Sequence, residues 1–474
     1  GFTELNLSSN LKIISKSSFY NCFGFSGTLT IPYSVTIIED YAFYNCTSFN
    51  NLQLHDSLQS IGKSSFEKCS NIKGSLELKD YSNLTVINER SFYECSSLES
   101  LSLPYSLVSI GSYAFYKCSG FKNYLTIPSY VTRTESYAFY QCSGFDRLNI
   151  DIPLEIIGEA AFYGCFGFGH TLEIPNSIKS IGPSAFCGCS GFESLSLLDE
   201  CLITEINESV FSGCFGFKCK LNIPSKIVCI GNKSFYNCSG FYELNMKENL
   251  IYINDSAFFG CSGFNGNLII PSTVTFIGPN SFYKCSGFNN LILSNNLIII
   301  SKEAFQYCIN LKGSLIIPNS VRIIDKNSFS GCSGFTENLE LPLSIEKIGS
   351  YAFSSTNFKN IFYKGDHEPN CSRDIGFAHD KIIYVYNNYT SNSFCYYNVI
   401  NLDPVNSPSQ SFSPSPSPSP SLSPEKNKIK LKPYQIVLIG VASIALIIFI
   451  VIVVCCIYRR RRNQQPGINP VEVN

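Results

Sequence analysis

Apolar and polar residues alternate in short stretches that recur along most of the chain. A typical stretch is Leu29-Thr30-Ile31-Pro32, in which two apolar side chains flank a polar one. This period of two predicts a short strand with two side chains directed inward and one outward. The proline that follows ends the pairing of the strand and turns the chain. The pattern therefore predicts many short, half-buried strands separated by turns.

The predicted strands recur at the interval of a set of cysteines, which we call the cysteine ladder. Its steps are mostly 23 and 24 residues in alternation, with one step of 26 and one of 25. A repeat of this length indicates a solenoid. The ladder consists of Cys22, Cys46, Cys69, Cys95, Cys118, Cys142, Cys165, Cys189, Cys214, Cys238, Cys261, Cys285, Cys308 and Cys332.

Other positions keep the same interval. Phe stands three residues before each ladder cysteine, and Ile stands five residues before that Phe, except at Thr134. A fifteenth Phe, Phe353, has Thr356 in place of the cysteine. Ala or Ser, and once Val210, precedes each Phe, and the small residue is expected to let neighbouring coils approach. Gly, Ser or Asn, which stands two residues after each cysteine, is expected to occupy a turn with positive φ.

These positions together predict the fold class. One coil cannot bury its apolar face alone, whereas fifteen stacked coils share a core. We therefore expect a β-dominated solenoid of parallel short strands, with about fifteen coils of 23–24 residues over 1–356. The first two residues, Gly1 and Phe2, match the Gly-Phe that follows most ladder cysteines. The N-terminus is therefore expected to be truncated within a repeat.

The repeating unit G-F-x-x-L-x-I-P-x-S-V-x-x-I-G-x-x-A-F-Y-x-C-S resembles the BspA-type leucine-rich repeats of the surface antigen BspA-like family. The resemblance implies a leucine-rich-repeat solenoid on a cell surface. It also implies adhesion to, or recognition of, host cells, matrix or other cells through the solenoid face. Two alternatives remain open: a ligand-sensing surface receptor that signals or is internalised through a short tail, and a non-adhesive structural coat antigen.

The composition changes three times after the repeats. Residues 357–403 are irregular and aromatic, and we expect a C-terminal cap over the last coil. Residues 404–433 are a Pro/Ser-rich stalk with a basic juxtamembrane segment. Residues 434–458 contain an uncharged stretch long enough for one transmembrane helix, followed by a short cytoplasmic tail at 459–474. This order predicts a single-pass plasma-membrane protein with extracellular repeats.

Charge and composition narrow the range of partners. The net charge is −1, and charged residues make up 15% of the chain, against about 25% in an average soluble domain. Without a basic excess, nucleic acid is not an expected partner. The expected partners are protein or glycan ligands on host or neighbouring cells, and the membrane.

Most of the 22 cysteines are accounted for by the repeat. One thiol per coil does not offer the paired spacing of a zinc site, and we expect the ladder to consist of buried thiols. Cys371 and Cys395, in the expected cap, are the candidate disulfide. Cys455 and Cys456, at the inner end of the expected span, are candidates for palmitoylation.

We expect no catalytic, cofactor or metal site, and no enzymatic activity. Asp366, His367 and Glu368, together with His379 and Asp380, are the one cluster with suitable chemistry. It lies in a polar loop, where solvated charges are the usual explanation. Candidate N-glycosylation sites precede the expected span, at Asn45, Asn83, Asn207, Asn232, Asn237, Asn254, Asn370 and Asn388.

The outward residue of each predicted strand lies on the exposed sheet face. Listed by coil, these residues are Asn6, Thr30, Gln53, Glu77, Ser102, Thr126, Asn149, Glu173, Ser196, Asn222, Asn245, Ile269, Ile292, Ile316 and Glu340. Three consecutive isoleucines, Ile269, Ile292 and Ile316, therefore predict an exposed apolar ridge. Such a patch is typical of a partner-binding surface. Two simpler explanations are that β-branched residues suit strands, and that the cap or a loop covers the ridge.

Overall fold

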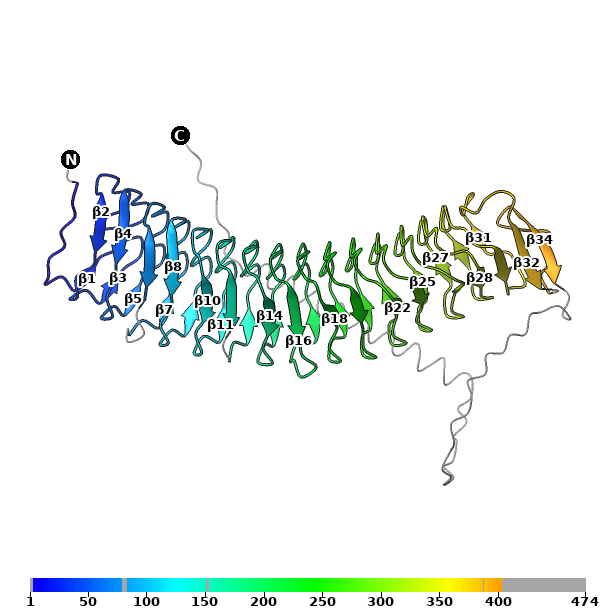
Figure 1. The fold of residues 1–474 in the computed structure, drawn as a ribbon, viewed down its shortest axis with the longest axis horizontal. Coiled ribbons are helices and arrows are strands. Elements are labelled where there is room, and N and C mark those ends of the chain that lie inside the picture. Colours follow the sequence, from blue (N-terminus) through cyan, green and yellow to red (C-terminus); the bar gives the residue numbers. More distant parts are fainter. Residues whose placement is uncertain (1–2, 79–82, 151–152, 387, 403–474) are drawn as a thin grey trace, which may run out of the picture. The chain divides into compact units, whose positions relative to one another are not determined.

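The computed structural model describes residues 3–78, 83–150, 153–386 and 388–402. All of them belong to the first of two compact units, residues 1–407; the second unit comprises 408–474. The described residues form a solenoid of stacked coils, with strands on two sides of each coil and no helix (Figure 1). The predicted leucine-rich-repeat solenoid is confirmed.

One side of the coils carries the strands predicted from the Leu-x-Ile pattern, and we call it the front ladder. Its strands are parallel to one another, except that the short strand β33 is antiparallel to β34. They are β2 (Gly27–Thr30), β4 (Phe49–Gln53), β6 (Gly74–Glu77), β8 (Leu98–Ser102), β10 (Tyr124–Ile127), β12 (Arg147–Ile150), β14 (Thr171–Ile174), β16 (Ser194–Leu197), β18 (Lys220–Asn222), β20 (Glu243–Asn245), β22 (Asn267–Ile269), β24 (Asn290–Ile292), β26 (Leu315–Ile316), β28 (Asn338–Leu341), β30 (Asn360–Tyr363), β32 (Ile382–Tyr386), β33 (Ser393–Phe394) and β34 (Tyr397–Leu402).

The other side carries two-residue strands, and we call it the back ladder. The second residue of nearly every strand is the repeating Ile, which points into the core. The strands are β1 (Ile13–Ile14), β3 (Ile37–Ile38), β5 (Ser60–Ile61), β7 (Val86–Ile87), β9 (Ser109–Ile110), β11 (Arg133–Thr134), β13 (Ile156–Ile157), β15 (Ser180–Ile181), β17 (Glu205–Ile206), β19 (Cys229–Ile230), β21 (Tyr252–Ile253), β23 (Phe276–Ile277), β25 (Ile299–Ile300), β27 (Ile323–Ile324), β29 (Lys347–Ile348) and β31 (Asn370–Cys371).

The core between the ladders is a stack of phenylalanine rings. The ring of Phe115 lies 5.5 Å from that of Phe92 and 5.3 Å from that of Phe139, centroid to centroid, with nearly parallel planes. The same stacking continues along the repeats, and these rings are fully buried. Each aromatic pair adds about 0.5–1.5 kcal/mol to the burial of its apolar area. The repeat therefore stabilises the stack by matching each coil to the next.

The cysteine ladder lies beside this stack as free thiols, nearly all fully buried. From Cys46 to Cys332, each Sγ donates a hydrogen bond of 2.9–3.1 Å to the carbonyl oxygen of the Phe in the preceding coil. Burial raises the pKa of Cys46 to about 12, from an ordinary value near 9. The thiols thus pack as expected and also satisfy a buried carbonyl, which the sequence did not indicate.

The positive φ expected for the glycine two residues after most ladder cysteines was wrong. A Cβ on Gly144 would lie 2.1 Å from the Phe121 carbonyl oxygen, and one on Gly216 would lie 2.0 Å from that of Ser190. Neither glycine has a positive φ; that conformation falls on the residue before the cysteine, such as Asn45 (φ 58°). Glycine is therefore required two residues after the cysteine because the backbones of adjacent coils touch at that position, not because the turn is left-handed.

The front ladder is hydrogen-bonded in pairs up to β24, as β2–β4, β6–β8, β10–β12, β14–β16, β18–β20 and β22–β24. In each pair the inward Leu lies seven residues after the cysteine in the first coil and six in the second, as with Leu125 and Leu148. The first coil of each pair therefore has one residue more between its cysteine and its strand. This extra residue shifts the strand relative to the coil before it, and the ladder is interrupted between one pair and the next. The alternating steps of 24 and 23 thus build two-coil units.

From β26 onward the front ladder is continuous, in the order β26-β28-β30-β32-β34-β33. The repeats were expected to end at residue 356, but parallel strands continue after it, beginning with β30. Phe377 stacks on Phe353 with centroids 4.9 Å apart and adds a sixteenth Phe to the fifteen predicted. The irregular segment expected after 356 therefore contributes regular strands, because Phe377 keeps the interval that the missing cysteine had obscured.

Among the described residues, no helix is long and apolar enough to cross a membrane. The predicted stalk at 404–433, the predicted span at 434–458 with Cys455 and Cys456, and the predicted tail at 459–474 lie outside the described residues.

Candidate binding surface on the front ladder

The outer face of the front ladder presents one or two rows of side chains, according to the length of each strand. In β22 and β24 the paired residues are Asn267 with Asn290, Leu268 with Leu291, and Ile269 with Ile292. The leucines point into the core, so the asparagines and isoleucines form two outward rows. Neighbouring residues of a row belong to successive coils, and this register decides which side chains form a common surface.

The three predicted ridge residues are exposed. Ile269 and Ile292 each keep 53% of their surface accessible, and Ile316 keeps 60%. Ile316 is aligned with Glu340 on the next strand. Neither a cap nor a loop in the described part of the chain covers these isoleucines, which removes one of the two simpler explanations for them.

The apolar row continues beyond the ridge, on residues that were not predicted. Phe362 is aligned with Glu340, Tyr384 with Phe362, and Ile400 with Tyr384. The rings of Phe362 and Tyr384 stack with centroids 5.3 Å apart, and Ile400 is 44% exposed. We call Ile269, Ile292, Ile316, Phe362, Tyr384 and Ile400 the apolar column. The alternation in Asn360-Ile361-Phe362-Tyr363 was the signal that could have revealed its second half.

A row of amide and hydroxyl groups borders the apolar column. Asn290 Nδ2 donates to Asn267 Oδ1 at 2.8 Å, and Asn360 Nδ2 donates to Asn338 Oδ1 at 2.9 Å. Between these pairs, the Ser314 hydroxyl accepts a hydrogen bond from the Asn338 backbone nitrogen at 3.3 Å. We call this row the asparagine row. It gives the apolar column a polar border that is neutral and able to form hydrogen bonds.

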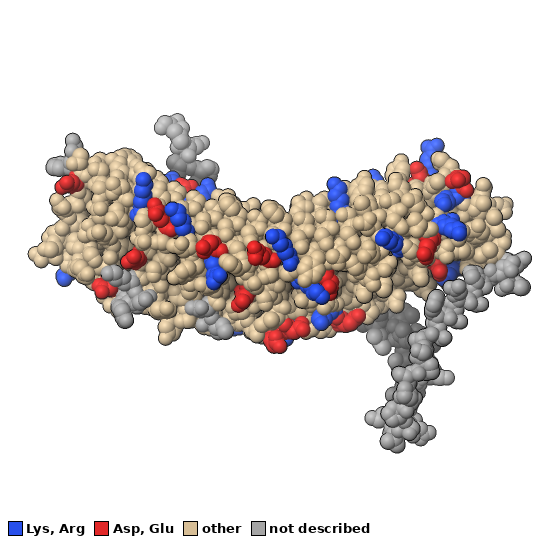
Figure 2. Space-filling model, in the orientation of Figure 1, with Lys and Arg blue, Asp and Glu red and all other residues tan. Residues whose placement is uncertain are grey.

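Charge contributes little to the apolar column. Its one interruption, Glu340, is paired with Lys364 at 2.7 Å between carboxylate and ammonium. Over the face of the solenoid in Figure 2, acidic and basic side chains are interspersed, without a broad patch of one sign. Attraction to the column must therefore come mainly from burial of apolar area.

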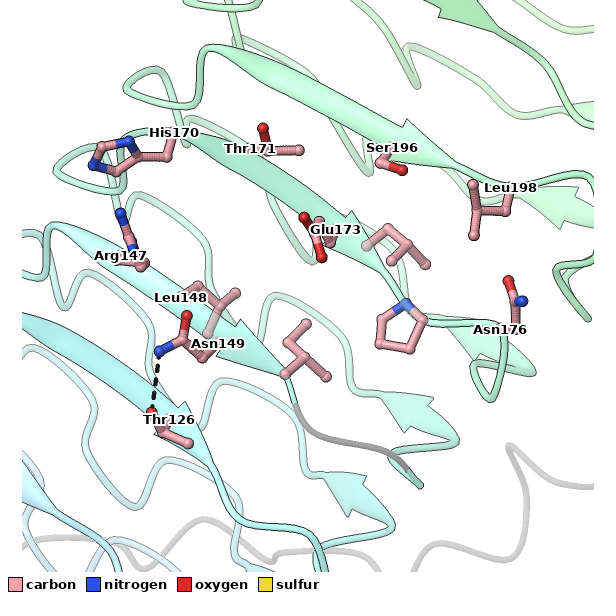
Figure 3. Close-up of a pocket in the computed structure, with 13 residues that line it drawn as sticks. Thr126, Arg147, Leu148, Asn149, His170, Thr171, Glu173, Asn176, Ser196 and Leu198 are labelled. Atoms are coloured by element: carbon pink, nitrogen blue, oxygen red, sulfur yellow. Dashed lines mark hydrogen bonds between the residues drawn. The ribbon is translucent and has the colours of Figure 1, made fainter.

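A polar groove lies in the other half of the front ladder, at the interruption between β12 and β14 (Figure 3). Its volume is about 740 Å³. Arg147 and His170 lie together at one end, and Glu173 lies near the middle. Asn149 Nδ2 donates to Thr126 Oγ1 at 3.3 Å on one wall. That His170 and Arg147 share a site was not predicted; the signal that could have shown it is their equal offset of five residues from Cys165 and Cys142.

Comparison with models of known protein families shows which family this chain belongs to. The model of the BspA-type leucine-rich repeat region, six copies long, matches residues 1–79, 74–171, 155–287 and 265–369. These matches cover well over half of the 474 residues.

The chain belongs to the BspA-type leucine-rich repeat family.

One solved structure agrees with this family on the fold. A leucine-rich repeat protein from Bacteroides ovatus is 24% identical, with a TM-score of 0.64, over 80% of this chain and 94% of the other. A leucine rich cell surface protein from Faecalibacterium prausnitzii is 22% identical, with a TM-score of 0.39, over 71% of this chain and 87% of the other. No curated protein sequence matches the chain. The BspA-type solenoid is thus shared, while partners are not transferred by these similarities.

In this BspA-type chain, a disulfide bond connects Cys371 and Cys395, the pair proposed from the sequence. Their Cα atoms lie 5.4 Å apart. Cys371 lies in β31 at the end of the back ladder, and Cys395 follows β33 at the end of the front ladder. The bond therefore connects the final elements of the two ladders.

The proposed glycosylation sites of the BspA-type coils fall into two groups. The exposed asparagines are Asn83, Asn232, Asn237, Asn370 and Asn388. The other three are partly buried and use the side-chain amide in hydrogen bonds between coils: Asn45 to Asn21 Oδ1 at 2.9 Å, Asn207 to the Ile181 carbonyl oxygen at 2.7 Å, and Asn254 to Cys229 Sγ at 3.3 Å. A glycan on these three amides would disturb contacts between coils.

The acidic and histidine cluster near the end of the repeats is exposed. His367 Nδ1 lies 2.5 Å from Asp366 Oδ1, and the hydrogen bond from this imidazole lowers the pKa of the carboxyl. His379 lines a different depression, with Arg373 and Tyr396. Within the described part of the chain, no group of three His, Cys, Asp or Glu side chains is arranged to hold a metal ion.

Proposed function

We propose that this BspA-type protein acts at a cell surface by binding a protein partner through the apolar column. The observation that carries the proposal is a row of six exposed or half-exposed apolar side chains at the outward positions of one face, interrupted at β28 by Glu340. A contiguous apolar patch on a solvent-facing sheet is typical of a contact surface. The role is non-enzymatic: the column supplies a recognition surface.

A protein partner fits the column better than other ligands do. Protein interfaces combine an apolar, uncharged centre with a polar rim. Here the isoleucines and the Phe362–Tyr384 pair supply the centre, and the asparagine row supplies hydrogen-bonding groups along one edge. A flat row of aliphatic side chains offers neither a cavity for a small molecule nor charge for nucleic acid.

The setting of this surface follows from the family and from the end of the chain. Proteins of this family are surface proteins, and residues 404–433 and 434–458 have the composition of a stalk and a transmembrane helix. In the proposed arrangement the repeats are extracellular and hold the column away from the membrane, and adhesion to host or neighbouring cells is the outcome of binding.

The test compares the full chain with the triple variant Ile269→Thr, Ile292→Thr, Ile316→Thr, each displayed on cells that do not otherwise adhere. Attachment to epithelial cells and to immobilised matrix proteins is measured. We expect at least tenfold weaker binding by the variant, since three buried aliphatic side chains contribute about 1.5–3 kcal/mol each when fully covered. Equal binding by both chains would overturn the proposal.

A matched control carries the same number of substitutions at the same outward positions of polar coils: Gln53→Thr, Ser102→Thr, Asn222→Thr. It is expected to bind as the unaltered chain does. A chain that ends at residue 458 separates the alternatives, because loss of attachment without the tail favours a receptor that acts through it. Absence of attachment by the unaltered chain favours a coat antigen and contradicts adhesion.

A further inference from the structure

The polar groove between β12 and β14 has features that the apolar column does not explain. Figure 3 shows that its wall and floor come from four successive strands, β10 to β16, on both sides of the interruption. Hydroxyl, amide and carboxylate groups line its middle, from Thr126, Asn149, Thr171, Glu173 and Ser196. The groove is therefore a hydrogen-bonding site at a defined structural discontinuity, about a hundred residues before the ridge.

His170 occupies a position where other coils have a residue better suited to the backbone. It is the extra residue of its long coil and has a φ of 63°. Five other long coils place Gly27, Gly74, Asn123, Gly266 or Gly313 at the equivalent position, all with positive φ. A residue with a side chain costs about 1 kcal/mol in this conformation. His170 thus places a hydrogen-bonding side chain at a position where four of these five coils have none.

Arg147 is a cation without a partner. In the part of the chain that the structure describes, no carboxylate forms an ion pair with it, whereas Lys220 at the corresponding position of β18 is paired with Glu243 at 2.9 Å. Tyr124 is aligned with Arg147 on the neighbouring strand and is 62% exposed. A free guanidinium beside an exposed aromatic ring is suited to a ligand that carries both an anionic group and an apolar face.

We infer that this groove binds a carboxylated sugar. The carboxylate of the sugar accepts hydrogen bonds from Arg147 and His170 at one end of the groove. Its hydroxyl groups donate to Glu173 and exchange hydrogen bonds with Asn149 and Thr171. Tyr124 lies outside the lining of the groove, beside Arg147 on the neighbouring strand, and offers its ring to a part of the ligand that extends past Arg147. Glu173 discriminates against ligands that are anionic throughout, because a second negative charge would face its carboxylate.

The test measures binding to the full chain, solubilised and immobilised, by surface plasmon resonance. The probes are 3′-sialyllactose and a hyaluronan tetrasaccharide, which carry a carboxylate, together with neutral lactose and a hexaglutamate peptide. We expect at least one of the carboxylated sugars to bind at least tenfold more tightly than lactose and hexaglutamate. Equal binding of lactose, or tighter binding of hexaglutamate, would overturn the inference, as would no binding of either acidic sugar.

Two variants distinguish a loss of sugar binding from a loss of folding. Arg147→Gln is expected to weaken sugar binding about tenfold, the loss of one charge-assisted interaction. His170→Gly is expected to weaken binding about fivefold while leaving the unfolding midpoint unchanged or higher, because glycine suits the positive φ. Lys220→Gln is the matched control and should bind within twofold of the unaltered chain. Unchanged binding by both groove variants would contradict the assignment.

This inference is independent of the proposed protein partner. The triple isoleucine variant should keep its sugar binding, and His170→Gly should keep its attachment through the apolar column. Loss of both activities in either variant would show that the two surfaces do not act separately and would count against the groove as a distinct site.

Discussion

The front ladder has two regions that differ in how neighbouring coils are joined. From β2 to β24 the strands pair two by two, and the ladder is interrupted after each pair. From β26 to β34 the ladder is continuous. The first region carries mostly polar outward residues and the groove with Arg147 and His170, whereas most of the apolar column lies in the second.

The difference shows that one residue of coil length decides whether neighbouring strands of the front ladder stay paired. Where the length alternates, each interruption separates neighbouring side chains and leaves room between strands, as at the groove. Where the length stays constant over Leu315 and Leu339, the strands stay paired and their outward side chains keep one register, Ile316 with Glu340. The same consensus therefore builds separate two-coil units in one part and a continuous sheet in the other.

The largest expected effect appears at alkaline pH, and most of the ladder thiols that cause it, Cys46 to Cys285, lie in the two-coil region. Burial raises the pKa of Cys46 to about 12 and raises those of the following ladder thiols as well, whereas an unfolded thiol ionises near 9. The native state therefore holds more protons between these values. Stability is complete below pH 9 and falls as pH rises toward 12, by about 1.4 kcal/mol per pH unit for each thiol that unfolding exposes.

Thermal unfolding followed by circular dichroism at pH 8, 9 and 10.5 measures this effect. The control replaces Cys238, Cys261 and Cys285 with Thr, the residue found naturally at position 356, and should show a shallower decline with pH. A decline of the same slope in both chains would contradict the role of the thiols.

Removal of the disulfide should affect the continuous region alone. The double variant Cys371→Ser, Cys395→Ser opens a loop with a sequence separation of 24 and should cost about 3 kcal/mol of local stability. Limited proteolysis is expected to cleave near residues 370–400 while the two-coil units stay resistant. Cleavage spread evenly over the repeats would show that the two regions unfold together.

Two glycines in the two-coil region should respond differently to alanine. A Cβ on Gly287 would lie 2.0 Å from the Phe264 carbonyl oxygen, so Gly287→Ala should force two coils apart and cost about 2–3 kcal/mol. Gly266 has φ +78° and open space around it, so Gly266→Ala should cost about 1 kcal/mol. Unfolding midpoints in urea compare them, and equal shifts would refute the contact explanation.

The smallest effect on stability is expected from the apolar column itself. Ile269, Ile292 and Ile316 are each more than half exposed, so replacement by Thr should change the free energy of unfolding by less than about 0.5 kcal/mol per site. The urea midpoint of the triple variant, measured beside its binding, tests this. A large loss of stability would mean that the column is part of the core.

The sequence predicted the features that recur in every coil. The interval of Phe, Ile and Cys identified the solenoid, its inward side chains and the exposed isoleucines, because each position meets the same position of the next coil. Features that depend on contacts between different positions of adjacent coils were missed. Gly144 was assigned to a left-handed turn, since sequence shows that a residue is small but not which neighbouring carbonyl requires it.

The candidate sites were predictable to different degrees. Ile269, Ile292 and Ile316 were found because they keep the repeat interval, whereas Phe362, Tyr384 and Ile400 follow the last ladder cysteine and lack that marker. The groove was not predicted, although its two basic residues were readable from the repeat. Arg147 and His170 each stand five residues after a ladder cysteine, Cys142 and Cys165, and equal offsets in adjacent coils bring side chains to the same end.

The interruptions of the two ladders also have a mechanical consequence. The back ladder is broken between β15 and β17 and again between β23 and β25, and the front ladder is broken at the neighbouring positions β16–β18 and β24–β26. In both places the Phe-containing turns still join the coils, as in the hydrogen bond from Phe186 nitrogen to Val210 oxygen at 3.0 Å. Each place therefore resembles a hinge with one intact edge. Under tension along the stack, we expect these joints to yield first and to let three stiffer blocks adjust without unfolding.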